Sequence, residues 1–243
     1  MAYDSMFDEL PRGPVSEAII QRITEALVDG RLKPGDKLPT EMEFSEKLGV
    51  GRNSVREAIK VLVAFGVLEI RRADGTFVVE EFSHKLLDPM VYGLILVRRS
   101  KEQLLEFKLA NLNAVLWAAI KRMTPEKVSH LRQLIEHVRE GFSQDDIDRD
   151  KLYMTTVEFY EYLGIASENP MLIQLNEVVL RLSHNSRNMA VNAAMDCPNL
   201  DRFVLVELYS DIVDVLESGD GNAIPALIDR VDEAWQKLVP FEV

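Results

Sequence analysis

The chain has 243 residues, a formal net charge of −12 and 47% hydrophobic residues, a profile typical of an ordered globular protein with one or two domains. No run of 18 apolar residues occurs, so no membrane span is expected, and the acidic start (Asp4, Asp8, Glu9) does not resemble a signal peptide. Cys197 is the only cysteine, which excludes an internal disulfide. We therefore expect a cytoplasmic protein with no membrane partner.

The negative charge is unevenly distributed along the chain. Residues 1–80 carry 11 Lys/Arg and 14 Asp/Glu, a net charge of −3, whereas the remainder carries −9. Binding to phosphate depends on local clusters of cations rather than on total charge. One such cluster falls within 21 positions and consists of Arg52, Arg56, Lys60, Arg71 and Arg72. We expect it to face nucleic acid and the acidic remainder to point away.

The first 14 residues are expected to form a flexible arm, since they end in Pro-Arg-Gly-Pro. Ser16 is the expected N-cap of a first helix that ends near Gly30. The apolar residues of this helix recur at helical spacing and are Ile19, Ile20, Ile23, Ala26 and Leu27.

Two further helices follow in close succession. Thr40 and Glu43 have the spacing of a capping box, which predicts a short helix ending at Gly49. The next helix is expected over about residues 53–65, closed by Gly66. Its predicted buried face consists of Val55, Ala58, Ile59 and Leu62.

Two short strands are predicted over residues 67–70 and 76–79, with residues 73–75 as the tip between them. Three helices followed by a two-stranded wing form a winged helix-turn-helix, which places one helix in the DNA major groove. The sequence therefore predicts a DNA-binding domain over residues 15–81.

From residue 83 onward every segment has helical character, and helix start signals recur at regular intervals. About seven helices are expected in an antiparallel bundle, which occupies an all-helical domain over residues 82–243. Their approximate ranges are 84–98, 101–123, 125–141, 145–166, 170–194, 199–218 and 222–239. The fold class is therefore mainly α.

Residues 38–78 resemble the GntR family of bacterial transcription regulators through Leu38-Pro39-Thr40-Glu41, the stretch from Leu48 to Ile59, and Asp74-Gly75-Thr76-Phe77-Val78. The helical part resembles the FadR subfamily, whose ligand-binding domain is of the FCD type. The residues that carry this second resemblance are Ala166-Ser167-Glu168-Asn169-Pro170, after Phe159, and Ile212 followed by Gly219-Asp220.

The resemblance implies a set of DNA contacts. Arg52 and Arg56 match the two arginines of the recognition turn and helix, whose planar guanidinium groups suit guanine or phosphate. For Arg56 an ion pair with a neighbouring glutamate is the alternative. Met42 and the Ala73-Asp74 wing tip depart from the family pattern. The expected DNA-binding residues are Thr40, Gly51, Arg52, Asn53, Ser54, Arg56, Arg71, Arg72 and Gly75.

Many members of the subfamily bind a divalent metal through one aspartate and three histidines. In this sequence the four positions fall on Thr156, Tyr160, Tyr209 and Val231, none of which is a good metal ligand. We therefore predict no metal and no other cofactor.

An effector site is still expected in the same space. Tyr160 and Tyr209 replace inward-pointing ligands, and Arg181, His184 and Asn188 share a helical face at positions i, i+3 and i+7. With Thr156 these residues are expected to bind a carboxylate or an acyl-CoA; the alternative is that the tyrosines fill the space and the other face is solvated. Lys108 and Asn111 stand where relatives often have Arg and Glu, which leaves the ligand class open.

The function that the sequence favours is a homodimeric transcription regulator, a repressor rather than an activator, that binds a palindromic operator in double-stranded DNA and responds to a small effector. Two alternatives remain: an architectural DNA-binding dimer without an effector, and an enzyme with an appended DNA-binding domain. Against the enzyme, the sequence contains no Gly-rich phosphate loop, no nucleophile elbow and no paired Cys/His motif, so no catalytic residue is assigned.

Overall fold

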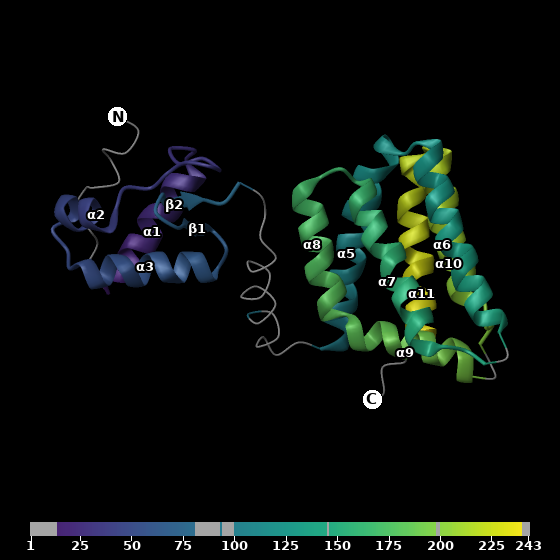
Figure 1. Cartoon of the computed structure of the whole chain (residues 1–243). Helices are drawn as coiled ribbons and strands as arrows, with labels where there is room; N and C mark the ends of the chain where they lie inside the picture. Colours follow the sequence, from purple (N-terminus) through teal and green to yellow (C-terminus); the bar gives the residue numbers. More distant parts are fainter. Residues whose placement is uncertain (1–13, 81–92, 94–99, 145, 198–199, 240–243) are drawn as a thin grey trace. The chain divides into compact units, whose positions relative to one another are not determined.

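The computed structural model describes residues 14–80, 93, 100–144, 146–197 and 200–239, which form the ribbons of Figure 1. Contacts within the chain divide it into two units, residues 1–93 and residues 94–243, and each is described by itself. The expected N-terminal arm, apart from Pro14, and the helix predicted over residues 84–98, apart from Gly93, lie outside the described residues.

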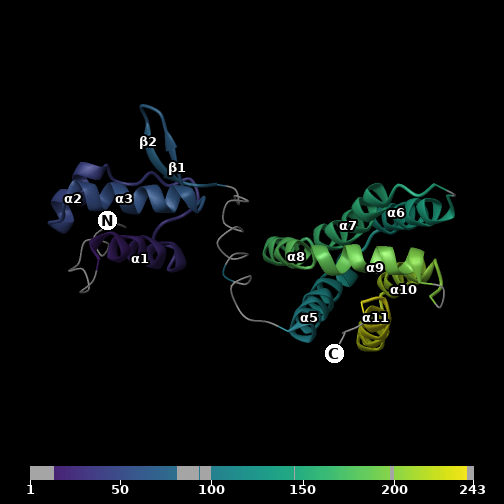
Figure 2. The ribbon, with the colours of Figure 1, turned by 90° about the horizontal axis from the view of Figure 1, so that it is seen from below.

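The first unit contains three helices and a two-stranded antiparallel sheet, as predicted. Its elements are α1 (Val15–Val28), α2 (Glu41–Leu48), α3 (Arg52–Ala64), β1 (Leu68–Arg71) and β2 (Gly75–Val78). In the sheet Leu68 pairs with Val78 and Arg71 with Gly75. Figure 2 shows the ribbon of β1 and β2 extending away from the three helices as a wing.

Capping residues determine where α2 begins and ends. The Thr40 side chain accepts a hydrogen bond from the Glu43 N–H, the Glu43 carboxylate accepts one from the Thr40 N–H, and Gly49 ends the helix at a φ of 63°. These features confirm the predicted capping box and C-terminal glycine. The prediction that Ser16 caps α1 is wrong. Pro14, which has extended backbone angles, occupies the N-cap position, and Ser16 lies inside the first turn.

The predicted buried face of the recognition helix is confirmed. Val55, Ala58, Ile59 and Leu62 of α3 are each at most 2% exposed and pack in one cluster with residues of α1, α2 and the wing. Burying each of the larger apolar side chains contributes about 1.5–3 kcal/mol. Since these residues fix one face of α3 inward, its basic and polar residues are held on the opposite, exposed face.

The second unit is an all-helical bundle. Its elements are α5 (Lys101–Ala119), η3 (Ile120–Arg122), α6 (Pro125–Ser143), α7 (Arg149–Ala166), α8 (Pro170–Leu182), α9 (His184–Asp196), α10 (Val204–Ser218), η4 (Gly221–Ala223) and α11 (Ile224–Leu238). Figures 1 and 2 show α9 lying across one end of the bundle. Helix α5 packs against α8 and α11, and α7 lies between α6 and α8.

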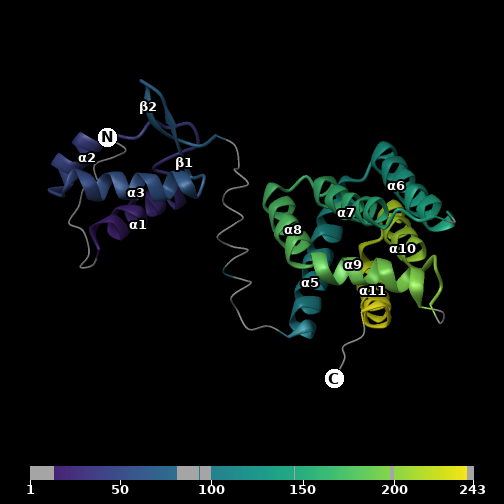
Figure 3. The same cartoon turned by 60° about the horizontal axis from the view of Figure 1, so that its bottom comes forward.

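The single helix predicted over residues 170–194 is in fact two helices. Helix α8 ends at Leu182 and α9 begins at His184, with a change of direction at Ser183 that is visible in Figure 3. The Ser183 hydroxyl is fully buried and donates a hydrogen bond of 2.6 Å to the Val179 carbonyl oxygen. A short polar side chain that bonds the backbone competes with helix continuation, which explains the break.

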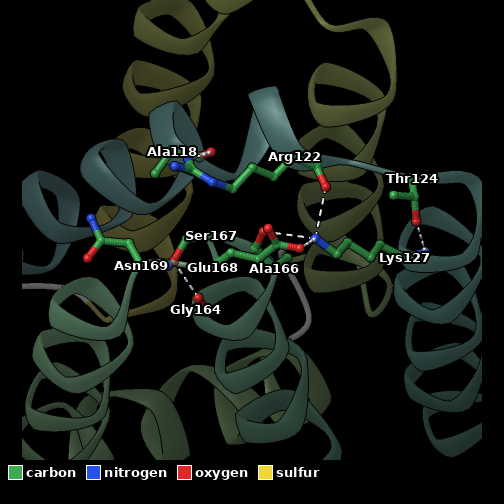
Figure 4. A network of polar contacts seen from close by, with 9 residues as sticks. All are labelled: Ala118, Arg122, Thr124, Lys127, Gly164, Ala166, Ser167, Glu168 and Asn169. Atoms are coloured by element: carbon green, nitrogen blue, oxygen red, sulfur yellow. Dashed lines mark hydrogen bonds and ion pairs between the residues drawn. The ribbon is translucent and has the colours of Figure 1, made fainter.

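The corner between α7 and α8 is tied to the connection that precedes α6, as Figure 4 shows. The Lys127 ammonium group donates to the Arg122 carbonyl oxygen at 2.8 Å, to the Ala166 carbonyl oxygen at 3.4 Å and to the Glu168 carboxylate at 2.7 Å. The Asn169 side chain caps α8. The segment from Ala166 to Pro170 therefore has a structural role in joining helices.

Candidate functional site

The N-terminus of α3 is an uncapped, positively charged helix end. Gly51 occupies the N-cap position, no side chain caps the helix, and the first turn contains no acidic residue. Arg52 and Asn53 are exposed and Ser54 is half-buried. Among the described residues, no hydrogen bond or ion pair engages the Arg52 side chain. Free N–H groups at a helix N-terminus together with a cation suit a phosphate group.

Arg56, one turn further along α3, is paired within the protein. Its Nε and Nη2 atoms donate to Glu41 Oε2 of α2 at 3.0 Å and 2.8 Å. This hydrogen bond raises the pKa of Arg56 above its usual value. The ion pair that the sequence left as the alternative is therefore present, and Arg56 must leave Glu41 in order to contact DNA through Nε and Nη2.

The wing carries both bound and unbound cations. Arg71 is bound to Glu69 and Glu80 at 2.6 Å and 3.1 Å, whereas Arg72 is exposed at the tip. Gly75 has a φ of 137°, a backbone conformation that residues with a side chain rarely adopt, so a substitution there is strained.

The acidic tip residue of the wing is neutralised by an unexpected partner. Lys37 forms an ion pair of 3.0 Å with Asp74 and bridges to Phe77 of β2. The sequence alone does not indicate this pair, because Lys37 is 37 positions away from Asp74 in the chain.

Thr40 is brought close to this surface but its hydroxyl group is already used. The hydroxyl accepts from the Glu43 N–H at 3.2 Å and donates to the Glu43 carboxylate at 2.8 Å. Its role in the structure is therefore to cap α2, and any contact with DNA is additional to that role.

In the bundle, three of the four positions implied for metal ligands lie together. Thr156, Tyr160 and Tyr209 are all buried, and the two tyrosine rings meet edge to face with centroids 5.5 Å apart. The Thr156 hydroxyl donates to the Tyr153 carbonyl oxygen at 2.7 Å. Burial raises the pKa of both tyrosines, which keeps them protonated.

The fourth position, Val231, has no donor atom, and it is also buried. Protonated tyrosines and a hydroxyl group that is already hydrogen-bonded are poor metal ligands, so these residues do not fit a divalent ion. In the described part of the chain, no group of three or more His, Cys, Asp or Glu side chains is placed to hold a metal.

The predicted face of Arg181, His184 and Asn188 is not formed, because the helix break at Ser183 separates the first residue from the other two. All three are exposed. Arg181 pairs with Glu177 at 3.1 Å, His184 Nδ1 lies 2.6 Å from the Tyr153 hydroxyl, and Asn188 contacts Asn192. None of the three lies among the residues that line the inner cavity described next.

Arg187 lines the inner cavity, where Arg181, His184 and Asn188 were expected. It is 3% exposed, and its guanidinium carbon lies 4.9 Å from the centre of the Tyr160 ring. Its Nη2 atom has a long contact of 3.4 Å to the Ser183 hydroxyl, while Nε and Nη1 have no hydrogen-bond partner among the described residues. Because the helix breaks at Ser183, Arg187 of α9 faces inward. The prediction of one continuous helix did not identify this buried arginine.

Lys108 of α5 is the second cation at this place. Its ammonium nitrogen lies 3.2 Å from the centre of the Trp235 ring and 3.5 Å from the Ser186 hydroxyl. Burial, together with the charge of Arg187, holds the pKa of Lys108 well below its usual value. The family resemblance identified Lys108 as a departure from relatives, but it did not predict that Lys108 lines the inner cavity.

Buried polar atoms complete the cavity. Asn111 donates to Asn176 at 2.9 Å, and Asn176 donates to the Tyr160 carbonyl oxygen at 2.8 Å. Among the described residues, the Asn111 side-chain oxygen and the Tyr160 hydroxyl have no hydrogen-bond partner of standard geometry, although the nearby Trp235 side chain slightly lowers the pKa of that hydroxyl.

The buried atoms surround an inner cavity of about 20 Å³, formed by α5, α7, α8, α9 and α11. A pocket of about 210 Å³ adjoins it and shares Leu105, Lys108 and Trp235 with it. Together they can hold a small ligand that reaches the two cations.

A winged helix with an exposed, cationic recognition helix defines the class: this is a DNA-binding protein with a second, all-helical unit. Residues 15–78 match the bacterial regulatory proteins of the gntR family, and residues 112–233 match the FCD domain. The chain belongs to the GntR family and carries an FCD domain, which binds small-molecule effectors; it is a transcription regulator and not an enzyme.

Similar proteins agree with this assignment. The chain is 26% identical to the HTH-type transcriptional regulator YcbG of Bacillus subtilis, over 89% of this chain and 86% of that protein. It is 27% identical to the Uxu operon regulator of Haemophilus influenzae, over 92% and 79% of the two chains. The structure of a Streptococcus agalactiae GntR protein shares the fold, with a TM-score of 0.55 and 23% identity over 90% and 99% of the two chains.

In the part of the chain that the structure describes, no helix has both the length and the apolar character needed to cross a bilayer.

Proposed function

We propose that the protein is a homodimeric repressor that binds a palindromic operator through α3 and the wing and is controlled by an effector in the FCD domain. The observation that carries this proposal is the N-terminus of α3, where exposed Arg52 stands at an uncapped helix end. A cation at that end is unfavourable for the helix dipole, so its position is best explained by an anionic partner.

The contacts divide by the chemistry of each residue. Gly51, Asn53 and Ser54 present backbone N–H groups and short polar side chains to phosphate, which fixes the position of the helix. Arg52 reads a base edge, and Arg56 joins it after leaving Glu41. The wing brings Arg72 to the adjacent groove around the turn at Gly75.

A single winged helix covers little DNA, since one module of this size buries roughly 600–1,000 Å² of protein surface. Two copies related by a twofold axis match a palindrome and double the contact area. Control by an effector then requires that the effector and the DNA favour different arrangements of the two copies, so that binding of one shifts the population available to the other.

The direct test is selection of sheared genomic DNA from the source organism by the purified protein at physiological salt, followed by sequencing. We expect strong enrichment of a few promoters that share a palindrome. Uniform recovery of all fragments would support the alternative of an architectural dimer, to which the stacked rings of Phe159 and Tyr209, with centroids 4.3 Å apart, lend some support by filling the bundle.

The role of Arg52 is tested on the enriched sequence. Replacing it, in Arg52→Ala, is expected to weaken specific binding by about 1–3 kcal/mol and to leave binding to random DNA less affected. The matched control is Arg139→Ala, which removes the same charge from α6, where Arg139 pairs with Glu136. An equal loss on specific and random DNA would show that Arg52 contacts only phosphate.

A further inference from the structure

Two basic side chains, Arg187 and Lys108, line the inner cavity of the bundle, and none of the described residues that line it is acidic. Among the described residues, no carboxylate forms an ion pair with Arg187 or with Lys108. The positive charge of Arg187 instead helps to lower the pKa of Lys108. The charge of Arg187 acts to lower the pKa of Glu161. Burial and the charges of Glu177 and Glu158 outweigh it, so the pKa of Glu161 is raised, whereas an ion pair with Arg187 would lower it.

Such an arrangement is costly in the free protein. Buried charges are normally paired or bound to a ligand, and a buried donor without a partner loses the hydrogen bonds that it made to water. Arg187 can donate five hydrogen bonds, but within the described part of the chain it makes only the long contact to Ser183. The strain is local, because it concerns one guanidinium group and one ammonium group that meet in the same small space.

The geometry points to a small organic acid as the missing partner, bound through its carboxylate by Arg187 and Lys108 without any metal. This inference rests on the proposed effector role of the FCD domain and names the ligand class. The guanidinium group of Arg187 lies against the ring of Tyr160, whose hydroxyl group also has no hydrogen-bond partner among the described residues.

A second orphan atom narrows the ligand further. The hydrogen bond from Asn176 to the Tyr160 carbonyl oxygen fixes how Asn176 is oriented, which in turn fixes the Asn111 amide with its oxygen free. An acceptor without a donor calls for an O–H or N–H group on the ligand. An acid with a hydroxyl group beside its carboxylate satisfies the cations and Asn111 together.

The size of the two cavities limits the rest of the molecule. The inner cavity of about 20 Å³ has room for about one water-sized group. The adjoining pocket of about 210 Å³ is below the roughly 300–1,000 Å³ of drug-sized sites, and apolar side chains form much of its lining. Lys108 borders both, which places the carboxylate at their junction and a short carbon chain in the outer pocket.

The inference is tested by calorimetric titration of the full-length protein, in the presence of EDTA, with sodium acetate, sodium glycolate and sodium phosphate at matched ionic strength. We expect binding of the carboxylates, tighter for glycolate than for acetate because glycolate carries the extra hydroxyl group. Phosphate serves to distinguish a carboxylate site from a general oxyanion site, and tighter binding of phosphate than of both acids would overturn the ligand class.

Variants identify the place of binding. Arg187→Met and Lys108→Met are each expected to lower glycolate affinity by roughly tenfold or more, since each removes a charge-assisted hydrogen bond. The matched controls are Arg181→Met, an exposed arginine on α8, and Lys121→Met, an exposed lysine whose ammonium nitrogen lies 3.5 Å from the centre of the Trp117 ring. Both controls are expected to bind glycolate as the natural protein does.

Thermal unfolding separates binding from a structural role. Without a ligand, Arg187→Met is expected to melt no lower than the natural protein, because it removes an unpaired buried charge. A loss of stability in Arg187→Met equal to that of a core truncation would overturn the inference, as would glycolate affinity that survives in both Arg187→Met and Lys108→Met. Lys108→Met keeps the test decisive if Arg187→Met does not fold.

The inference and the proposed function can fail independently. Absence of binding by any of the three anions up to about 50 mM, in protein that still selects a palindrome, would overturn the anion site and leave DNA binding intact. Glycolate binding that depends on Arg187 but does not alter DNA affinity would support the site and count against control by that effector.

Discussion

At the level of single residues, the ion pair between Arg56 and Glu41 has a direct consequence for DNA binding. Both side chains are partly exposed, at 54% and 35%, so the pair is worth little to folding, yet it must open before Arg56 reaches DNA. We expect Glu41→Gln to strengthen operator binding about two- to fivefold. Glu46→Gln, which removes a charge from the same helix, is the control; an equal gain in both variants would show a general charge effect.

Lys108 gives the free protein a defined dependence on pH. Its pKa is lowered in the folded state, so between that value and its usual 10.5 the unfolded chain holds a proton that the folded chain has lost. Stability therefore rises with pH across this window. We expect Lys108→Met to remove the rise, as measured by urea unfolding from neutral to alkaline pH.

The difference between the pH profiles of the natural protein and Lys108→Met reports on Lys108 alone. The buried tyrosines, whose pKa values are raised, contribute equally to both profiles. Lys121→Met should keep the pH profile of the natural protein. Since a bound acid favours the protonated ammonium group, saturating glycolate should flatten the rise. Parallel profiles for Lys108→Met and the natural protein would contradict the account.

At the level of elements, the contact between α7 and α8 depends on the absence of a side chain at Gly164. A Cβ atom there would lie 2.8 Å from the Asn176 amide nitrogen, which is held by its bond to the Tyr160 carbonyl oxygen. Gly164→Ala is therefore expected to destabilise the bundle by about 1–3 kcal/mol despite the higher helix propensity of alanine. The midpoint of urea unfolding measures this loss.

Gly141→Ala on α6 is the matched control for that substitution. Its new Cβ atom would meet the end of the Leu152 side chain at 3.0 Å, which can move aside. We expect this variant to unfold close to the natural protein or slightly above it. If Gly164→Ala were equally stable, the close contact of α7 with Asn176 would not be a constraint on the fold.

Local signals predicted the elements well, and long-range pairing explains what they missed. Thr40, Glu43 and Gly49 set the limits of α2 because caps act within one turn. The break at Ser183 was not predicted, because serine in a helix is common and only its burial shows that its hydroxyl bonds the backbone. That one break decided which of Arg187 and its neighbours faces the cavity.

At the level of the whole molecule, the sequence predicted a winged helix followed by a helical unit, but it did not predict which side chains meet in the inner cavity. Tyr160 and Tyr209 were assigned to a buried space and are buried there. The partners of Arg56 and Asp74 come from other elements, so spacing along the chain could not identify them. The cations of the cavity, likewise, come from α5 and α9.

The replacement of all four implied metal ligands predicts a protein that works without a divalent ion. Elemental analysis of protein purified without chelator should find well below one divalent ion per chain, and EDTA should change neither the melting temperature nor operator binding. One tightly bound ion per chain would contradict this prediction.

The most direct test of control by an anion is a titration of labelled operator DNA, with and without saturating glycolate, for the natural protein, Arg187→Met and Arg181→Met. We predict that glycolate changes the operator Kd at least about fivefold for the natural protein and Arg181→Met, and leaves Arg187→Met unchanged. An unchanged Kd in the natural protein, or an equal change in Arg187→Met, would contradict the account.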